Sequence, residues 1–422
     1  MRRSAAVLLA LALVATGASP ASGRAAWRHR LDRLVAGRSL GVSVWRDGAP
    51  IYEHEAKLRR VPASNQKLLT SMALLDVLGP ARRLPTIAAA RRVRGGVVRG
   101  NLWILGRGDP ALGSRRSFVR ELRFGATRVQ ALARRIAGAG IRRVRGRVIG
   151  STGYFRHDWD APGWRPYFRA RYIAVPTALT FEGNSHGGRY ITDPERRLAA
   201  VLTSQLRSLG VKVAGRPAAR RPPRRLAPVA RVWSRPLQAL LGYMNRRSSN
   251  FFAEVLGKRL SVSRWGRPGS IAGAARAVTE WAAARGVEVV AHDASGLSYR
   301  NRISARGLVR LLQAANRSPW GRVLRRSLPG PGGGTLEGRL RGVPVRAKTG
   351  TLDRVSALSG WVWLRRSRAW AEFAIMSRGV LKHQAADVED RIVRILSRRG
   401  RSGAAGPRRG RAGDAGERPG RA

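Results

Sequence analysis

Residues 62–80 read PASNQKLLTSMALLDVLGP, and this stretch decides the fold because it describes one apolar helix with a polar start. Pro62 suits the first turn of a helix, and a glycine–proline pair ends one. Apolar residues occupy every face between these ends, a composition typical of a buried helix. The spacing of Ser64 and Lys67 places both side chains on one face of the first turn. The sequence therefore predicts a buried helix whose N-terminal turn carries a hydroxyl beside an amine.

Strands from both ends of the chain surround this helix in the predicted fold. Residues 40–45 and 50–54 alternate apolar and polar residues around an Asp-Gly pair, which indicates a hairpin. Apolar runs predict three more strands, at residues 343–347, 358–364 and 369–376. Apolar periodicity predicts helices at residues 26–37, 237–244, 270–285, 304–315 and 384–397. Joined in one sheet, the strands make an antiparallel sheet with helices on both faces and a helical half beside it.

The middle of the chain has a different texture and is predicted to form a separate unit. It carries a predicted hairpin at residues 91–98, a strand at 102–105, a helix at 128–139 and a strand at 144–149. Residues 215–228 read GRPAARRPPRRLAP, which predicts a linker rich in proline and arginine. We therefore expect an accessory domain inserted between the two halves of the main one.

The composition limits the chemistry. The 422 residues include 82 Lys and Arg against 24 Asp and Glu, a formal net charge of +58. Six of the basic residues are lysine, and the arginines are spread along the whole chain. One interpretation is a compositional bias that makes every solvated face basic. The other is attraction to a polyanion, such as an anionic cell-envelope polymer or nucleic acid. The absence of cysteine excludes thiol catalysis, disulfides and zinc–thiolate or iron–sulfur sites.

The two ends of the chain are predicted to lie outside the folded body. Residues 1–24 combine a basic start, a short apolar run and small residues, which is typical of a secretory signal peptide. We therefore expect an exported protein of the periplasm or extracytoplasmic envelope, which argues against a specific nucleic-acid partner. Residues 397–422, rich in arginine and glycine and without apolar periodicity, are expected to be a disordered tail.

Two further short motifs carry side chains suited to catalysis. Ser248 and Asn250 are two residues apart, so a tight loop can direct a hydroxyl and an amide into one cleft. Lys348, Thr349 and Gly350 close a predicted strand, where the ammonium and hydroxyl can bind a carboxylate and the glycine admits a ligand to the strand edge. Each motif alone also has an ordinary interpretation, as a helix cap or a surface lysine.

Together, the three motifs resemble those of the penicillin-recognising active-site serine enzymes. The flanking segments resemble the D-alanyl-D-alanine carboxypeptidase/endopeptidase family typified by penicillin-binding protein 4 (peptidase family S13), over residues 38–395. These segments are PASNQKLLTSMALL, GNLWILGRGDPAL, MNRRSSNFFAEVLGK, HDASGLSYRNRIS, GGTLEGRL and VRAKTGTLDRVSALSGWVW. The resemblance implies a β-lactamase/transpeptidase-like α/β (α+β) fold, with a catalytic domain over residues 27–90 and 236–396 and an inserted accessory domain over residues 91–235.

The resemblance also implies roles for the motif residues. Ser64 would be the nucleophile acylated by the peptidoglycan stem peptide, or by a β-lactam that mimics it. Lys67 would take the proton of that serine. Ser248 would relay the proton to the leaving amine, Asn250 would hold a substrate amide, and Lys348 would supply positive potential.

In the third motif, the resemblance implies that Thr349 binds the terminal carboxylate of the substrate beside Gly350. The backbone N–H groups of Ser64 and Thr351 would form the oxyanion hole. The sequence departs from the family pattern at Ser249, where aspartate is common, and in a shorter accessory region.

Two other functions fit parts of the sequence. A β-lactamase-like hydrolase shares the motifs but needs an efficient deacylating base, which the sequence does not identify. A catalytically idle exported protein that binds wall polymers would use only the positive charge, and the intact motifs argue against idleness. The six histidines show no metal-ligand spacing, so neither a metal nor another cofactor is expected.

Overall fold

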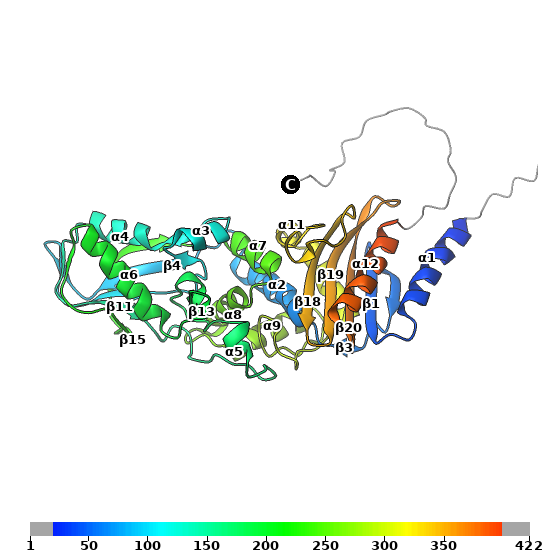
Figure 1. Cartoon of the computed structure of the whole chain (residues 1–422), viewed down its shortest axis with the longest axis horizontal. Coiled ribbons are helices and arrows are strands. Elements are labelled where there is room, and N and C mark those ends of the chain that lie inside the picture. The colour runs from blue at the N-terminus through cyan, green and yellow to red at the C-terminus, as the bar shows by residue number, and fades with distance from the viewer. Residues whose placement is uncertain (1–19, 399–422) are drawn as a thin grey trace, which may run out of the picture.

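The structure, a computed structural model, describes residues 20–398 and shows an elongated molecule with a β-sheet towards each end and helices between them (Figure 1). The first sheet is antiparallel, with strand order β18-β19-β20-β1-β2. It joins the N-terminal strands β1 (Leu40–Arg46) and β2 (Ala49–His54) to the C-terminal strands β18 (Val345–Leu352), β19 (Val355–Leu364) and β20 (Ala369–Arg378). The predicted sheet made from both ends of the chain is confirmed.

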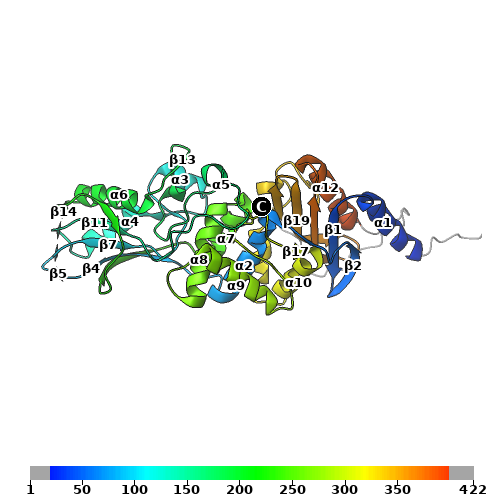
Figure 2. The ribbon, with the colours of Figure 1, turned by 90° about the horizontal axis from the view of Figure 1, so that it is seen from below.

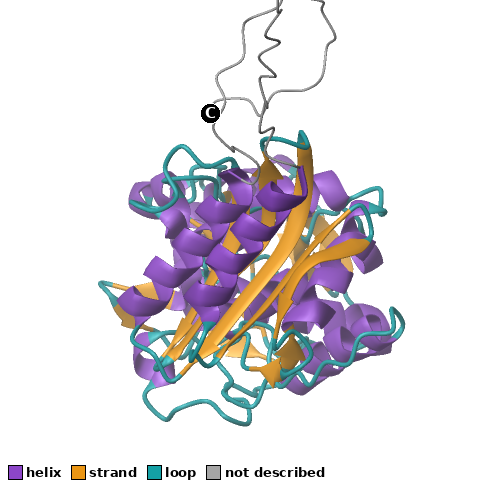
Figure 3. Cartoon of the chain, turned by 90° about the vertical axis from the view of Figure 1, so that its right-hand side faces the viewer, coloured by secondary structure: helices purple, strands orange, loops and turns teal. Residues whose placement is uncertain are grey.

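Helices cover both faces of this sheet because its central strands are apolar on both sides. In β19, the side chain of Val362 enters the core shared with α1 (Pro20–Val35) and α12 (Lys382–Arg398). The neighbouring Trp361 enters the core of the helical half, as the alternation of a strand requires. Figure 3 shows helices crossing in front of the strands on one of these faces.

The helical half surrounds the helix that opened the sequence argument. That helix, α2 (Gln66–Leu78), follows a short 3₁₀ turn, η1 (Ala63–Asn65), and ends at Gly79. Its leucines are fully buried, as predicted. Around it lie α7 (Leu237–Arg247), α8 (Asn250–Trp265), α9 (Ile271–Ala283), α10 (Ala305–Asn316) and α11 (Gly321–Ser327). The sequence did not predict α8, since burial on most of its faces removes the one-sided apolar periodicity that marks a surface helix.

The second sheet is built from the middle of the chain. Its strand order is β15-β11-β7-β4-β16, and it is flanked by α4 (Val129–Gly138) and α6 (Pro194–Ser208), as Figure 2 shows from below. The strands are β4 (Pro85–Ala90), β7 (Leu102–Leu105), β11 (Val148–Ser151), β15 (Ala218–Arg220) and β16 (Ala227–Trp233). A smaller sheet consists of β14 (Lys212–Val213), β10 (Arg143–Val144), β6 (Val97–Val98) and β5 (Val93–Arg94).

Two predictions about this region need correction. A domain boundary after Ala90 cuts through the second sheet, because β4 pairs with β16 along its whole length. The unit therefore begins before Pro85. Residues 215–228 are not a plain linker, because they contain all of β15 and the start of β16. Both are edge strands, where proline is tolerated, so the composition misled the prediction.

Shorter elements complete the described chain. They are β3 (Arg59–Arg60), β8 (Leu112–Gly113), α3 (Arg116–Glu121), β9 (Thr127–Arg128), α5 (Phe168–Arg171), η2 (Glu182–Asn184), β12 (Ser185–His186), β13 (Arg189–Tyr190), β17 (Ile303–Ser304) and η3 (Gly334–Leu336).

The predicted terminal segments fall largely beyond the described residues. Of the predicted signal peptide, residues 1–19 lie outside them, and the rest belongs to the start of α1. The predicted tail begins two residues too early, because α12 continues through Arg398 and buries Ser397; residues 399–422 lie outside the described part. Within residues 20–398, no helix has both the length and the apolar character to cross a bilayer.

Candidate active site

The first two site residues meet at the start of the buried helix. Ser64 is partly buried in η1, and Lys67 is completely buried one turn later in α2. The ammonium nitrogen Nζ of Lys67 lies 3.0 Å from the hydroxyl Oγ of Ser64. The two side chains therefore touch, as their spacing predicted.

A loop from the far side of the helical half holds this turn in place. Gly296 has φ +86°, and a Cβ there would stand 1.9 Å from the backbone oxygen of Ala63. Glycine is required at this point both by conformation and by space. The loop can therefore approach the residue before Ser64 closely enough to place its own carbonyl groups beside Lys67.

Lys67 sits among acceptors that define where its hydrogens go. Its Nζ donates to Oδ1 of Asn250 at 2.7 Å and to the backbone carbonyl of Ser295 at 2.6 Å. The amide of Asn250 is oriented by its Nδ2, which donates to the carbonyl of Tyr172. Because both partners of Lys67 only accept, a neutral amine there keeps two hydrogens on them and turns its lone pair toward Ser64.

Burial makes that neutral form accessible. It lowers the pKa of Lys67 from 10.5 to about 7, although the negative charges of Asp293 and Glu254 act in the opposite direction. Near neutral pH, the lysine is therefore divided between its charged and neutral forms. A group with that property is matched to general-base work.

The second motif lies at the junction between α7 and α8. Ser248 ends α7 in the left-handed conformation, with φ 53°, and Asn250 is the first residue of α8. The predicted tight loop is thus a sharp helix–helix junction. The intervening Ser249 caps α8 by accepting a hydrogen bond from the N–H of Phe252. Serine and aspartate are both good N-caps, so the departure from the family pattern preserves the junction.

The third motif approaches from the sheet. Lys348 is completely buried inside β18, rather than at the end of a strand as predicted, and its Nζ donates to Oγ of Ser248 at 2.9 Å. Burial and the nearby positive charge of Lys67 hold the pKa of Lys348 well below its usual value. The hydroxyl of Thr349 hydrogen-bonds that of Thr335 at 2.7 Å. Two lysines therefore face one site from the helical half and from the sheet.

The glycine of the third motif lets the sheet edge contact the nucleophile turn. A Cβ at Gly350 would lie 2.8 Å from the carbonyl oxygen of Pro62 and 3.1 Å from the backbone nitrogen of Ser64. A larger side chain would push β18 away from η1. The next residue, Thr351, pairs with Ser356 of β19 and is exposed at the end of this contact.

Two buried carboxylates behind Lys67 were not predicted as site residues. Asp293 accepts hydrogen bonds from Nε1 of Trp164 and from the N–H of Ser298, both at 2.7 Å. Glu254 accepts from the N–H groups of Ala294 and Ser295, and burial raises its pKa to about 8. Together they hold the loop whose carbonyl binds Lys67.

These carboxylates differ in the sequence signal that could have found them. Residues 293–297 belong to a segment already noted as part of the family resemblance. Glu254 lies on the unpredicted helix α8, so nothing in the sequence marked it. Among the described residues, no cluster of His, Asp and Glu could hold a metal ion.

Comparisons with known proteins agree with this geometry. The model of the D-Ala-D-Ala carboxypeptidase 3 (S13) family matches residues 28–188 and 185–399. Carboxypeptidase DacB of Mycolicibacterium smegmatis is 30% identical over 393 residues, covering 87% of this chain and 79% of its own length. Carboxypeptidase Rv3627c of Mycobacterium tuberculosis is 31% identical over 402 residues, covering 89% and 80%.

A solved structure shows the same fold. Penicillin-binding protein 4 from Haemophilus influenzae superposes with a TM-score of 0.73 at 20% identity, covering 87% of this chain and 99% of that one. The predicted mixed fold, with its β-lactamase-like sheet and helical half, is therefore confirmed. Since the family model matches most of the sequence and the three motifs converge on one site, the chain belongs to the D-Ala-D-Ala carboxypeptidase 3 (S13) family.

Proposed function

We propose that the protein is a serine D-alanyl-D-alanine carboxypeptidase/endopeptidase that cleaves peptidoglycan stem peptides through an acyl-serine intermediate. One observation carries the proposal: the buried amine of Lys67 lies 3.0 Å from the hydroxyl of Ser64, with its other hydrogens assigned to Asn250 and Ser295. This arrangement turns a weak nucleophile into a reactive one. The family membership supports the substrate class.

In acylation, the neutral amine of Lys67 takes the hydroxyl proton as Oγ of Ser64 attacks the carbonyl carbon of the peptide. The carbonyl oxygen becomes an oxyanion, which the backbone N–H groups of Ser64 and Thr351 stabilise. Collapse of this intermediate forms the serine ester and breaks the peptide C–N bond. The proton then passes through Ser248 to the leaving amine.

The positive edge of the site positions the substrate. Lys348 touches Ser248 at 2.9 Å, so it can orient the relay hydroxyl as well as attract negative charge. Thr349 offers its hydroxyl to the terminal carboxylate, and Asn250 offers its amide to a substrate carbonyl or N–H group. Water then hydrolyses the ester and releases the shortened peptide.

The β-lactamase alternative differs in the last step. A β-lactam acylates the same serine, and a β-lactamase must then activate water efficiently. Of the described carboxylates behind Lys67, Glu254 and Asp293 are engaged with the 293–298 loop, and neither hydrogen-bonds Ser64. We therefore expect a long-lived β-lactam adduct.

The test of the function is release of D-alanine from a synthetic stem peptide by the purified protein, together with the lifetime of a β-lactam adduct followed by intact mass. We expect D-alanine release and an adduct that persists for many turnovers of the peptide. Rapid loss of the adduct with little D-alanine release favours the β-lactamase alternative. A folded protein that shows neither reaction is the idle wall-binding protein.

We also propose that the protein acts outside the cytoplasm and is retained there by its basic surface. Its substrate class lies in the cell wall, and residues 1–24 have the pattern of a signal peptide. The envelope fraction of cells making the full chain should contain a protein whose mass lacks those residues. Raising the salt concentration should release it, because exposed charges are screened. An uncleaved protein, or one whose retention ignores salt, contradicts this location.

A further inference from the structure

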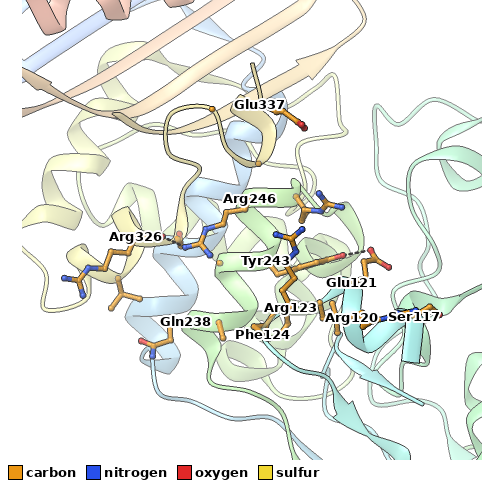
Figure 4. Close-up of a pocket in the computed structure, with 18 residues that line it drawn as sticks. Ser117, Arg120, Glu121, Arg123, Phe124, Gln238, Tyr243, Arg246, Arg326 and Glu337 are labelled. Carbon is orange, nitrogen blue, oxygen red and sulfur yellow. Dashed lines mark hydrogen bonds between the residues drawn. The ribbon is translucent and has the colours of Figure 1, made fainter. Parts of the chain in front are cut away.

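A large pocket beside the proposed active site has no role in the mechanism described so far. It has a volume of about 1210 Å³ and lies between α3, α7, α11 and the loop that leads into η3 (Figure 4). It shares Tyr243 and Glu121 with a neighbouring cavity of about 400 Å³, which Ser248 and Asn250 line. The pocket is therefore separated from the catalytic hydroxyls by a single side-chain pair.

Arginines from separate elements converge on this pocket. Arg120 comes from α3, Arg123 from the turn after it, Arg246 and Arg247 from the end of α7, and Arg326 from α11. None of the five forms an ion pair with a carboxylate within the described residues. They are exposed to the pocket, and their guanidinium groups remain available to a ligand.

The acidic residues of the pocket leave most of this charge uncompensated. Glu121 accepts a hydrogen bond from the hydroxyl of Tyr243 at 2.8 Å, and Glu337 is the second carboxylate in the lining. Behind the pocket, burial and the charges of Arg246 and Arg326 lower the pKa of Arg346. Positive charges there repel one another, so an anion in the pocket would be strongly favoured.

The pocket is also connected to the reactive residues through the chain itself. Arg247 immediately precedes Ser248, the hydroxyl that contacts Lys348. Gly334 lines the pocket and precedes Thr335, which hydrogen-bonds Thr349. A substrate bound at Ser64 and Thr349 can therefore extend an acidic part into the arginines.

We propose that this arginine pocket binds a carboxylate carried by the substrate away from the scissile bond, and so selects acidic stem peptides over neutral ones. The proposal rests on the proposed function for the identity of the substrate. Guanidinium groups suit carboxylates because their fork matches the two oxygens. Phosphate presents the same oxyanion chemistry, so the experiment below separates the two sources.

The test uses two synthetic peptides that both end in D-Ala-D-Ala, one with free side-chain carboxylates and one with the same groups amidated. Binding of each is measured to Ser64→Ala, and hydrolysis of each by the unmodified protein. We expect the acidic peptide to bind about tenfold tighter or more, with a preference that falls as salt rises. In Ser64→Ala combined with Arg246→Gln and Arg326→Gln, the two dissociation constants should approach each other.

The matched control is Arg134→Gln, which removes one charge from an exposed position of α4 outside the pocket and should preserve the preference. The rate of β-lactam acylation shows that each variant with an intact Ser64 retains an assembled site. Equal binding of both peptides to Ser64→Ala overturns the proposal. A preference that survives Arg246→Gln and Arg326→Gln also overturns it.

The remaining arms separate other sources of failure. If polyphosphate binds at the arginines and the acidic peptide shows no preference, the pocket serves a phosphate polymer and the proposal is wrong. If neither peptide is hydrolysed, the proposed function fails, while the binding comparison still decides whether the pocket selects carboxylates.

Discussion

Replacing Ser64 with alanine is expected to abolish the β-lactam adduct and to lower D-alanine release by at least ~10⁴-fold, since residues acting as a nucleophile–base unit lose nearly all their contribution together. The hydroxyl is the atom that forms the covalent bond, and it lies 3.0 Å from the buried amine that activates it. Intact mass after incubation with a β-lactam measures the adduct directly.

The matched control is Ser71→Ala on the same helix. Ser71 is completely buried and its hydroxyl contacts Asn245, away from the reacting groups. That variant should lose some stability but still form the adduct. If Ser64→Ala still becomes acylated while Ser71→Ala does not, the nucleophile has been assigned to the wrong serine.

Acylation is expected to rise with pH and to level off above a midpoint near 7, because Lys67 must be neutral to accept a proton. Its pKa is lowered by burial to about 7, so the charged form dominates below that pH and the neutral form above it. Below the midpoint, the rate should fall about tenfold per pH unit. The measurement is the second-order rate of β-lactam acylation across pH 5 to 9, read by stopped assays and intact mass.

The magnitude follows from the neutral fraction. At pH 7 an ordinary lysine is neutral in only about one molecule in 3,000, whereas a pKa near 7 makes about half of the molecules competent. Lys67→Met removes the base and should lower acylation by about 10³- to 10⁴-fold. The residual rate should lose its midpoint near pH 7.

Lys258→Met provides the comparison for this variant. Lys258 is also completely buried, but its ammonium pairs with Asp158 at 2.7 Å, outside the site. Removing it should lower the free energy of unfolding while the acylation midpoint stays near pH 7. A midpoint that disappears in Lys258→Met, or survives in Lys67→Met, rules out Lys67 as the titrating base.

The sequence predicted much of the fold through short-range patterns. Alternation and apolar periodicity located the hairpin of β1 and β2, the buried helix α2 and the three C-terminal strands. These patterns work because pleat and helix pitch repeat within a few residues. Helix α8 and edge strands β15 and β16 escaped prediction, because full burial in one case and proline content in the other obscured the usual signals.

By itself, the sequence determined which side chains could react: the spacing of Ser64 and Lys67 within one helical turn made their contact a local matter. Only the tertiary structure decided that Lys67 would be a base. Its burial and its acceptors come from Asn250 and Ser295, which are 183 and 228 positions away. The same holds for the arginine pocket, whose charges lie on separate helices. Desolvation and charge convergence depend on distant segments packing together, and no spacing along the chain records that packing.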